Sequence, residues 1–156
     1  MIFSAEWTYL LTTRKVGGED SVFSYVRIKY GENATDTVSG VIIYPDDFSF
    51  SEAGVASMKF GGSPVALRQQ INAADWEALE NAGCIFLPGA KMSDISYSPP
   101  LTETTFGTLV YYWSSSAYTS ANKFFVCFYL FDGGLNAANS ASSHNRIPVR
   151  LVQDLE

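Results

Sequence analysis

Several residue types are scarce in this chain of 156 residues, and each shortage argues against a class of protein. Two cysteines are too few for a framework of disulfide bonds. The single histidine, His144, has no cysteine or carboxylate cluster near it in the sequence, so we expect neither a metal site nor a cofactor. A net charge of −6 without a basic stripe argues against nucleic acid as a partner, because phosphates need cations beside them.

Long apolar runs and common catalytic motifs are also missing. No segment approaches the length of a membrane span, so we expect no membrane insertion. Residues 1–4 lack the basic and apolar regions of a signal peptide. Three explanations stay open: the protein is exported by another route, it is a component of a phage particle, or its leader has been removed. The sequence contains no CxxC, HExxH or GxGxxG pattern and no P-loop.

The residues that are present predict one loop-rich α+β domain over 1–156, with two short helices and antiparallel sheets. Ser4 is expected to cap the first helix, which ends near Arg14, and Asn72 to cap the second, with Asp75 completing a capping box before a stop at Gly83. Strands are predicted at 21–30, 37–44, 84–87, 108–113, 123–131 and 147–152, with irregular segments at 46–70 and 88–106.

Residue spacing within these elements predicts which side chains are buried. Trp7, Leu10 and Leu11 share one face of the first helix, and Trp76, Leu79 and Ala82 form the buried stripe of the second. Segment 21–30 alternates in the manner of a half-exposed strand, and 37–44 is its expected antiparallel partner. Cys84 is interpreted as a small buried hydrophobe.

The last quarter of the chain has an unusual composition. From Ser114 to Asn145 the only charged side chains are Lys123 and Asp132. The strand predicted at 123–131 is apolar on both faces, so it is either a central strand covered on both sides or a strand that offers aromatic groups to a partner. The polar stretch from Leu135 to Asn145 shows no strand or helix periodicity and is interpreted as a long loop, a usual place for binding residues.

Five segments together resemble a known family. They are Phe3 to Leu11, Val38 to Asp46, Asp75 to Pro88, Tyr112 to Ser116 and Val149 to Val152. In order and spacing they resemble the C-type-lectin-like domains of gut Bacteroidetes, such as Bacteroides, and their phages in the human gut microbiome, a group related in fold to formylglycine-generating enzyme. It includes hypervariable proteins diversified by retroelements. The resemblance implies a variable ligand-binding region at about 114–148.

Diversification in that family changes adenines of asparagine codons and cannot yield Lys, Trp, Gln, Glu or Met. From Ser114 to Val152 only Lys123 belongs to those five types. The resemblance implies that Val126, Phe128, Trp113 and Arg150 are fixed scaffold. The implied ligand-binding residues are Tyr118, Ser120, Asn122, Phe125, Cys127, Tyr129, Phe131, Leu135, Asn136, Asn139, Ser143, His144 and Asn145.

The leading hypothesis is therefore a non-catalytic receptor or adhesin domain, on a bacterial surface or a phage virion, whose C-terminal strand and loops recognise a protein or glycan on a cell or particle. A structural or assembly subunit of a pilus tip or phage tail is the alternative. An enzyme of the formylglycine-generating type would need two reactive thiols, and Cys84 and Cys127 do not match that pattern. A calcium-dependent lectin would need more carboxylates than Asp132, or the pair Asp46 and Asp47, can supply.

Overall fold

The computed structural model describes residues 3–20, 23–30, 36–61, 69–89, 110–117, 124–131, 134–142 and 149. Along β6 and β7 the description covers the backbone pairing and the burial of Asn136. The elements are α1 (Ser4–Thr8), a π-helical turn (Tyr9–Thr13), β1 (Phe23–Tyr30), β2 (Asp36–Ile43), β3 (Gln69–Ile71), α2 (Ala73–Asn81), β4 (Ile85–Pro88), β5 (Val110–Ala117), β6 (Phe124–Phe131) and β7 (Gly134–Ser142).

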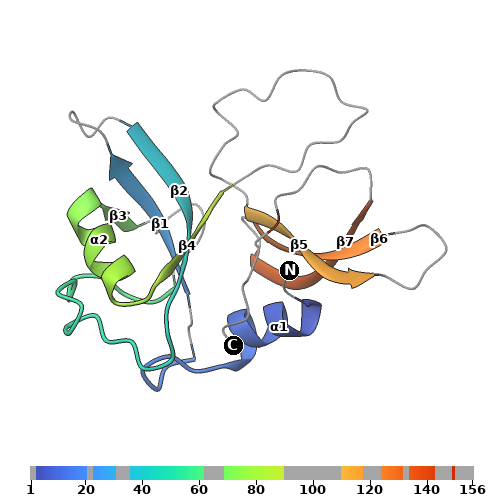
Figure 1. Ribbon diagram of the computed structural model, residues 1–156, viewed down its shortest axis with the longest axis horizontal. Coiled ribbons are helices and arrows are strands. Elements are labelled where there is room, and N and C mark those ends of the chain that lie inside the picture. Colours follow the sequence, from blue (N-terminus) through green and yellow to red (C-terminus); the bar gives the residue numbers. More distant parts are fainter. Residues whose placement is uncertain are drawn as a thin grey trace, which may run out of the picture.

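The described strands form two sheets (Figure 1). The first has four strands in the order β3-β1-β2-β4, and the second has three in the order β5-β6-β7. The α/β composition with two short helices was predicted correctly, as was the antiparallel pairing of β1 with β2. The first sheet is nevertheless mixed, because the short strand β3 runs parallel to β1. Strand β3 was not predicted from the sequence. No helix in the described part of the chain is long and apolar enough to cross a membrane.

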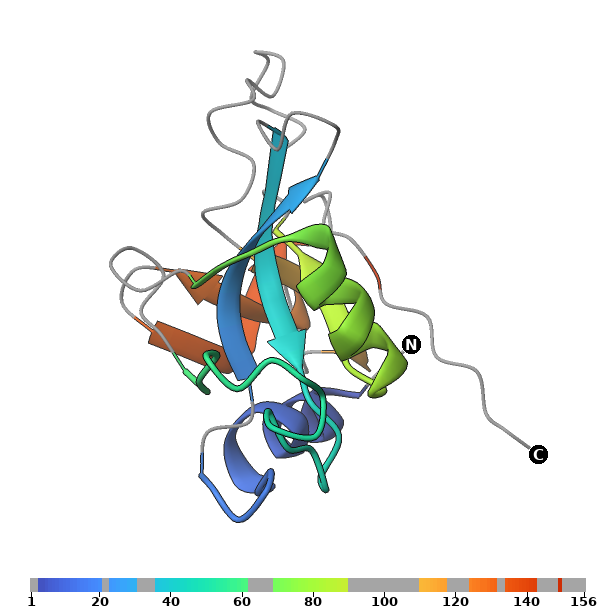
Figure 2. The same cartoon turned by 90° about the vertical axis from the view of Figure 1, so that its left-hand side faces the viewer.

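The first sheet is covered on both faces. Helix α2 lies against one face, and the second sheet lies on the other (Figures 1 and 2). Val26 and Ile28 of β1 belong to the core on the α2 side, whereas Tyr25 belongs to the core shared with the second sheet. The prediction of a half-exposed strand at 21–30 was therefore wrong for Tyr25, which is buried because a non-local layer covers its face.

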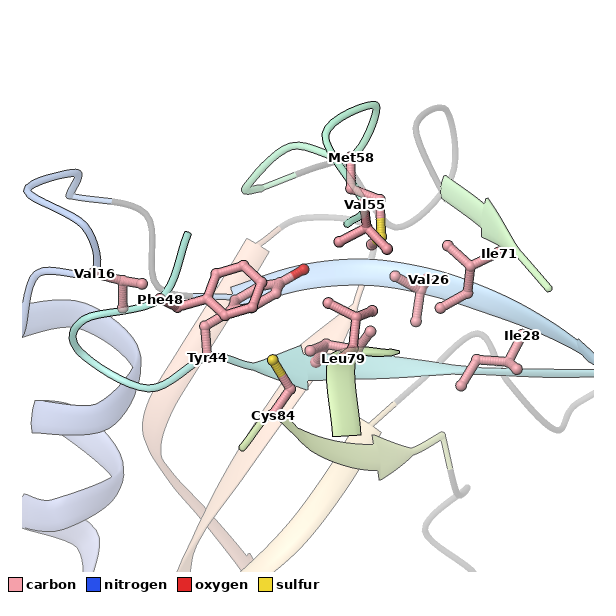
Figure 3. Close-up of a cluster of buried hydrophobic side chains, with 11 residues drawn as sticks. Val16, Val26, Ile28, Tyr44, Phe48, Val55, Met58, Ile71, Leu79 and Cys84 are labelled. Atoms are coloured by element: carbon pink, nitrogen blue, oxygen red, sulfur yellow. The ribbon is translucent and has the colours of Figure 1, made fainter. Parts of the chain in front are cut away.

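Figure 3 shows the core on the α2 side. Asn72 caps α2 as predicted: its Oδ1 accepts a hydrogen bond from the Asp75 amide at 2.8 Å, and the Asp75 carboxylate accepts one from the Asn72 amide at 3.2 Å. Leu79 is fully buried, and Gly83, with φ +83°, ends the helix. Strand β4 lies at the edge of its sheet and leaves Ile85 43% exposed, although Leu87 is buried.

The segment after β2 is anchored by aromatic rings. Tyr44, Phe48, Phe50 and Phe60 contact one another, with centroid distances such as 4.6 Å for Tyr44 and Phe48 and 4.6 Å for Phe50 and Phe60. Residues 46–61 form turns, in agreement with the irregular segment predicted there. Burial raises the pKa of the Tyr44 hydroxyl, so this ring stays neutral inside the core.

Helix α1 packs against all three strands of the second sheet. Trp7 and Leu11 are buried and Leu10 is partly buried, as their spacing predicted. The cap is Phe3 and not Ser4, so the predicted start was one residue late. The Phe3 amide donates to the Glu6 carboxylate at 2.6 Å, which supplies the reciprocal half of a capping box without a side-chain acceptor at the cap.

Candidate functional site

The three-stranded sheet holds the predicted binding region, and its β5 strand shows which face is which. Val110, Tyr112 and Ser114 are buried, whereas Tyr111 and Trp113 between them are half-buried. This alternation is typical of a strand whose two faces meet different environments. One face of the sheet therefore looks into the core beneath it, and the other carries Tyr111 and Trp113.

Tyr112 fixes the core face to the rest of the molecule. Its ring lies 6.1 Å from that of Trp7 on α1, centroid to centroid. Its hydroxyl donates a hydrogen bond of 3.1 Å to the carbonyl oxygen of Pro88 at the end of β4. These contacts hold the second sheet against both α1 and the first sheet, so the core face is positioned by two independent elements.

Strand pairing extends this assignment from β5 to β6. In the antiparallel register Val110 is opposite Leu130 and Tyr112 opposite Phe128, while Tyr111 is opposite Tyr129 and Trp113 opposite Cys127. Residues directly opposite each other in an antiparallel pair lie on the same face. By register, Phe128 therefore shares the core face, and Cys127 and Tyr129 share the opposite face.

The same face includes two of the predicted asparagines. Asn139 is paired with Cys127 and Asn136 with Tyr129, although the asparagines are three positions apart and their partners only two. The register shift between these pairs is a β-bulge, which changes the alternation of β7. Without it, two residues three apart would lie on opposite faces. Asn136 is half-buried.

The remaining predicted residues fall into three groups. Phe125 is paired with Ala117 and Ala141, and Phe131 with Gly134. Leu135 is paired with Leu130, which places it by register on the face of Val110 and not with the two asparagines. Six predicted binding residues lie outside the described part of the chain: Tyr118, Ser120, Asn122, Ser143, His144 and Asn145. The predicted scaffold residue Arg150 also lies outside it.

The long loop predicted from Leu135 was wrong over its first part. Residues Gly134–Ser142 form β7, a strand of nine residues. Its Asn, Ala, Gly and Ser content has low strand propensity, so no local pattern indicates it. The strand exists because β6 supplies hydrogen-bonding partners along its length. Leu135, Asn136 and Asn139 therefore stand on a paired strand and not on a loop.

A second irregularity, in β5, connects the sheet to α1. Trp113 and Ala117 are four positions apart, but their partners Cys127 and Phe125 are two apart, so β5 bulges between them. The bulge presents the Ser116 hydroxyl to the amide of Ser4, which donates to it at 3.0 Å. The Ser116 amide in turn donates to the Ser114 hydroxyl at 3.2 Å. The bulge thereby satisfies an amide in the first turn of α1.

Sequence reasoning did not assign Tyr111 to any surface and treated Trp113 as scaffold. The sequence from Val110 to Trp113 indicates a strand with two different faces. Which of the two faces looks into the core is decided by the contacts of Tyr112 with Trp7 and Pro88. Trp113 also forms a parallel bridge with Val149, within the strand predicted at 147–152. Both Tyr111 and Trp113 thus lie beside predicted binding positions in the sheet.

The three strands of the second sheet carry no formal charge. Strands β5, β6 and β7 contain no Asp, Glu, Lys, Arg or His. Among the residues that the structure describes, no three of His, Cys, Asp or Glu lie together as a possible metal site. Cys84 is a free buried thiol on the far side of the first sheet, and burial raises its pKa to about 12, which disfavours the reactive thiolate.

Comparison with protein-family models, curated proteins and solved structures found no match.

Proposed function

We propose that this chain is a non-catalytic ligand-binding domain with a C-type-lectin-like fold, and that the sheet face bearing Cys127, Tyr129, Asn136 and Asn139 contacts the ligand. The ligand is a protein or glycan on the surface of another cell or particle. The domain acts outside the cell, on a bacterial surface or a phage virion, and the positions of β6 and β7 on this face are diversified by a retroelement.

One observation carries the proposal. The register brings four residues that were selected from the sequence as ligand-binding onto one face of one sheet, even though two of them are an odd number of positions apart. The core face is held separately, by Trp7 and by the Tyr112 hydrogen bond to Pro88. Side chains on the far face can therefore change without removing these core contacts, which is the property that a variable recognition surface needs.

The buried thiol supports the non-catalytic reading. Formylglycine-type chemistry needs accessible thiols of low pKa, whereas Cys84 is buried and its pKa is raised to about 12. Cys127 is paired with Trp113 and Asn139 in the second sheet, whereas Cys84 belongs to the core cluster on the α2 side of the first sheet.

Sequencing of this locus from natural populations, with its flanking DNA, tests the proposal. We expect a reverse-transcriptase gene, a near-copy of the codons for residues 114–152, and substitutions concentrated at positions 125, 127, 129, 136 and 139. Val126 and Phe128 are the internal controls, because they stand on the core side of the same strand and should be invariant. Equal variation at control and face positions, or none at either, contradicts the proposal.

An assembly subunit of a pilus tip or phage tail would use the same face differently. Its face would be covered by a second subunit in the purified state. Two measurements on the purified chain distinguish these roles: sedimentation gives its oligomeric state, and hydroxyl-radical footprinting gives the solvent accessibility of Tyr129 and Phe131. If the chain is a binding domain, we expect both rings to be accessible to solvent. A stable oligomer that protects both rings would favour the assembly role.

A further inference from the structure

Strand β4 is an edge of the first sheet among the strands that the structure describes. It pairs antiparallel with β2, with Ile42 opposite Phe86. Ile85 at its start is 43% exposed, and Phe86 is half-buried. The outer side of an edge strand presents backbone groups to which a strand of another molecule can add, and exposed apolar side chains favour that addition.

The register shows which backbone groups of β4 point away from β2. The Gly89 amide donates a hydrogen bond of 2.8 Å to the Ser39 carbonyl oxygen, so these two residues form a hydrogen-bonded pair. In an antiparallel ladder such pairs alternate with pairs whose amides and carbonyls point outward. The backbone of Leu87 therefore faces β2, whereas the backbone groups of Phe86 and Pro88 point to the outer side of the strand.

The backbone groups on both sides of Phe86 are already engaged or absent. The Cys84 amide donates to the Leu79 carbonyl oxygen of α2 at 3.0 Å. Pro88 has no amide hydrogen. Its carbonyl oxygen accepts the hydrogen bond of 3.1 Å from the Tyr112 hydroxyl. A strand added at this edge could bond to the backbone of Phe86, but at Pro88 it would find no donor and an acceptor already bound.

We propose that Pro88 and the Tyr112 hydroxyl together form an edge block, which prevents β4 from pairing with the same strand of a second copy of this chain. A second copy is the relevant partner because it presents the same uncharged sequence, Ile85–Pro88, so no like charges would oppose the contact. Two copies related by a two-fold axis would bring these edges together antiparallel. The edge block is independent of the proposed ligand-binding function.

Sedimentation velocity of the purified chain over a range of concentrations tests the edge block. The double variant Pro88→Ala/Tyr112→Phe gains an outward amide at position 88 and loses the hydroxyl bound to that carbonyl. We expect its self-association constant to rise at least about tenfold over that of the unaltered chain, because the strand edge can then form additional hydrogen bonds. Amide hydrogen exchange at Phe86 should slow in the associated form.

Ile71→Val is the matched control for a loss of stability. Ile71 is buried on β3, which lies at the other end of the described strand order, and the variant loses one methyl group of the core. We expect its self-association to equal that of the unaltered chain.

Ile85→Lys, added to the double variant, is the second control. Lysine on an edge strand opposes pairing, and Ile85 is the exposed apolar side chain of this edge. The triple variant should return to the self-association of the unaltered chain. Near-ultraviolet circular dichroism verifies the fold of each variant.

Three results would overturn the inference. They are unchanged self-association of the folded double variant, an equal rise in Ile71→Val, and a rise that persists in the triple variant. Should the double variant fail to fold, Pro88→Ala alone decides the question, because it keeps Tyr112 and its contact with Trp7. That single variant must still associate more tightly than the unaltered chain.

Discussion

The hydroxyl of Tyr112 on β5 donates a hydrogen bond of 3.1 Å to the carbonyl oxygen of Pro88 on β4, and so joins the two sheets. The ring of the same residue packs in the core with Trp7. One side chain therefore positions the sheet that bears the candidate binding face relative to the remainder of the domain.

Tyr112→Phe removes this hydrogen bond and leaves the ring in place. We expect the free energy of unfolding to fall by about 0.5–1.5 kcal/mol, the usual net contribution of one hydrogen bond. Urea denaturation measures the change. Tyr30→Phe, at an exposed tyrosine, should leave stability unaltered, and an equal loss in both variants would contradict a specific role for the Pro88 contact.

Arg14 and Asp46 form an ion pair with unequal exposure. Arg14 Nη1 lies 2.6 Å from Asp46 Oδ1, and the two side chains are 5% and 67% exposed respectively. Asp46→Asn should reduce the free energy of unfolding by about 1–3 kcal/mol, because a buried guanidinium loses its counter-charge while water at the aspartate limits the cost.

Asp47→Asn is the matched control for this pair, since Asp47 is the neighbouring exposed carboxylate and the change in net charge is identical. Thermal unfolding of both variants gives the comparison. The role assigned to the ion pair would be wrong if Asp47→Asn were as destabilising as Asp46→Asn.

Gly40 of β2 leaves space for a neighbouring ring. A Cβ at this position would lie 2.3 Å from the Leu87 carbonyl oxygen and 2.6 Å from ring atoms of Phe86. Gly40→Ala should destabilise the protein by about 1–3 kcal/mol, because the added Cβ would force the backbone of β4 at Leu87 to shift. Chemical denaturation, with Thr37→Ala at an exposed position of the same strand as control, provides the test; a neutral Gly40→Ala would show that β4 can move aside.

Burial of Cys84 predicts a loss of stability in alkali. Its pKa in the folded chain is about 12, whereas an unfolded cysteine has a pKa of about 8.5. Between these values the unfolded state releases the proton first and binds fewer protons, so the free energy of unfolding falls as pH rises. Below a pH of about 8.5 the Cys84 thiol is protonated in both the folded and the unfolded state, so its contribution to the free energy of unfolding is fully present.

Unfolding curves measured across this alkaline range should show a shallower fall for Cys84→Ala than for the unaltered chain. Tyr44 changes stability in the same direction, because burial also raises its pKa, so some slope should remain. Identical slopes in the two proteins would contradict the effect. Alkylation followed by mass spectrometry should find Cys84 protected at neutral pH until the protein unfolds.

Elements with local signals were predicted from the sequence. The second helix carries its own start at Asn72 and Asp75 and its own stop at Gly83, and each forms the predicted contact or backbone angle. The pairing of β1 with β2 likewise follows from two neighbouring strand patterns. Such signals involve residues a few positions apart, so a single sequence contains them.

Features that depend on distant partners were missed or misjudged. Tyr25 is buried because the second sheet lies over it, and β7 forms because β6 pairs with it. The polar composition of β7 gives no sign of that pairing. For the candidate site, the sequence predicted β6 and its two faces, whereas the strand carrying Asn136 and Asn139 and the position of Tyr111 required the register.

The bulge in β7 has a consequence for comparing natural versions of this chain. Asn136 and Asn139 share a face only because one additional residue separates them. A homologue shorter by a single alanine at 137 or 138 would place one of the two asparagines, by register, on the core face of the sheet, even if every other residue were the same. Deletions in this stretch should therefore be rarer than exchanges, and gapped alignments across it would join positions that point in opposite directions.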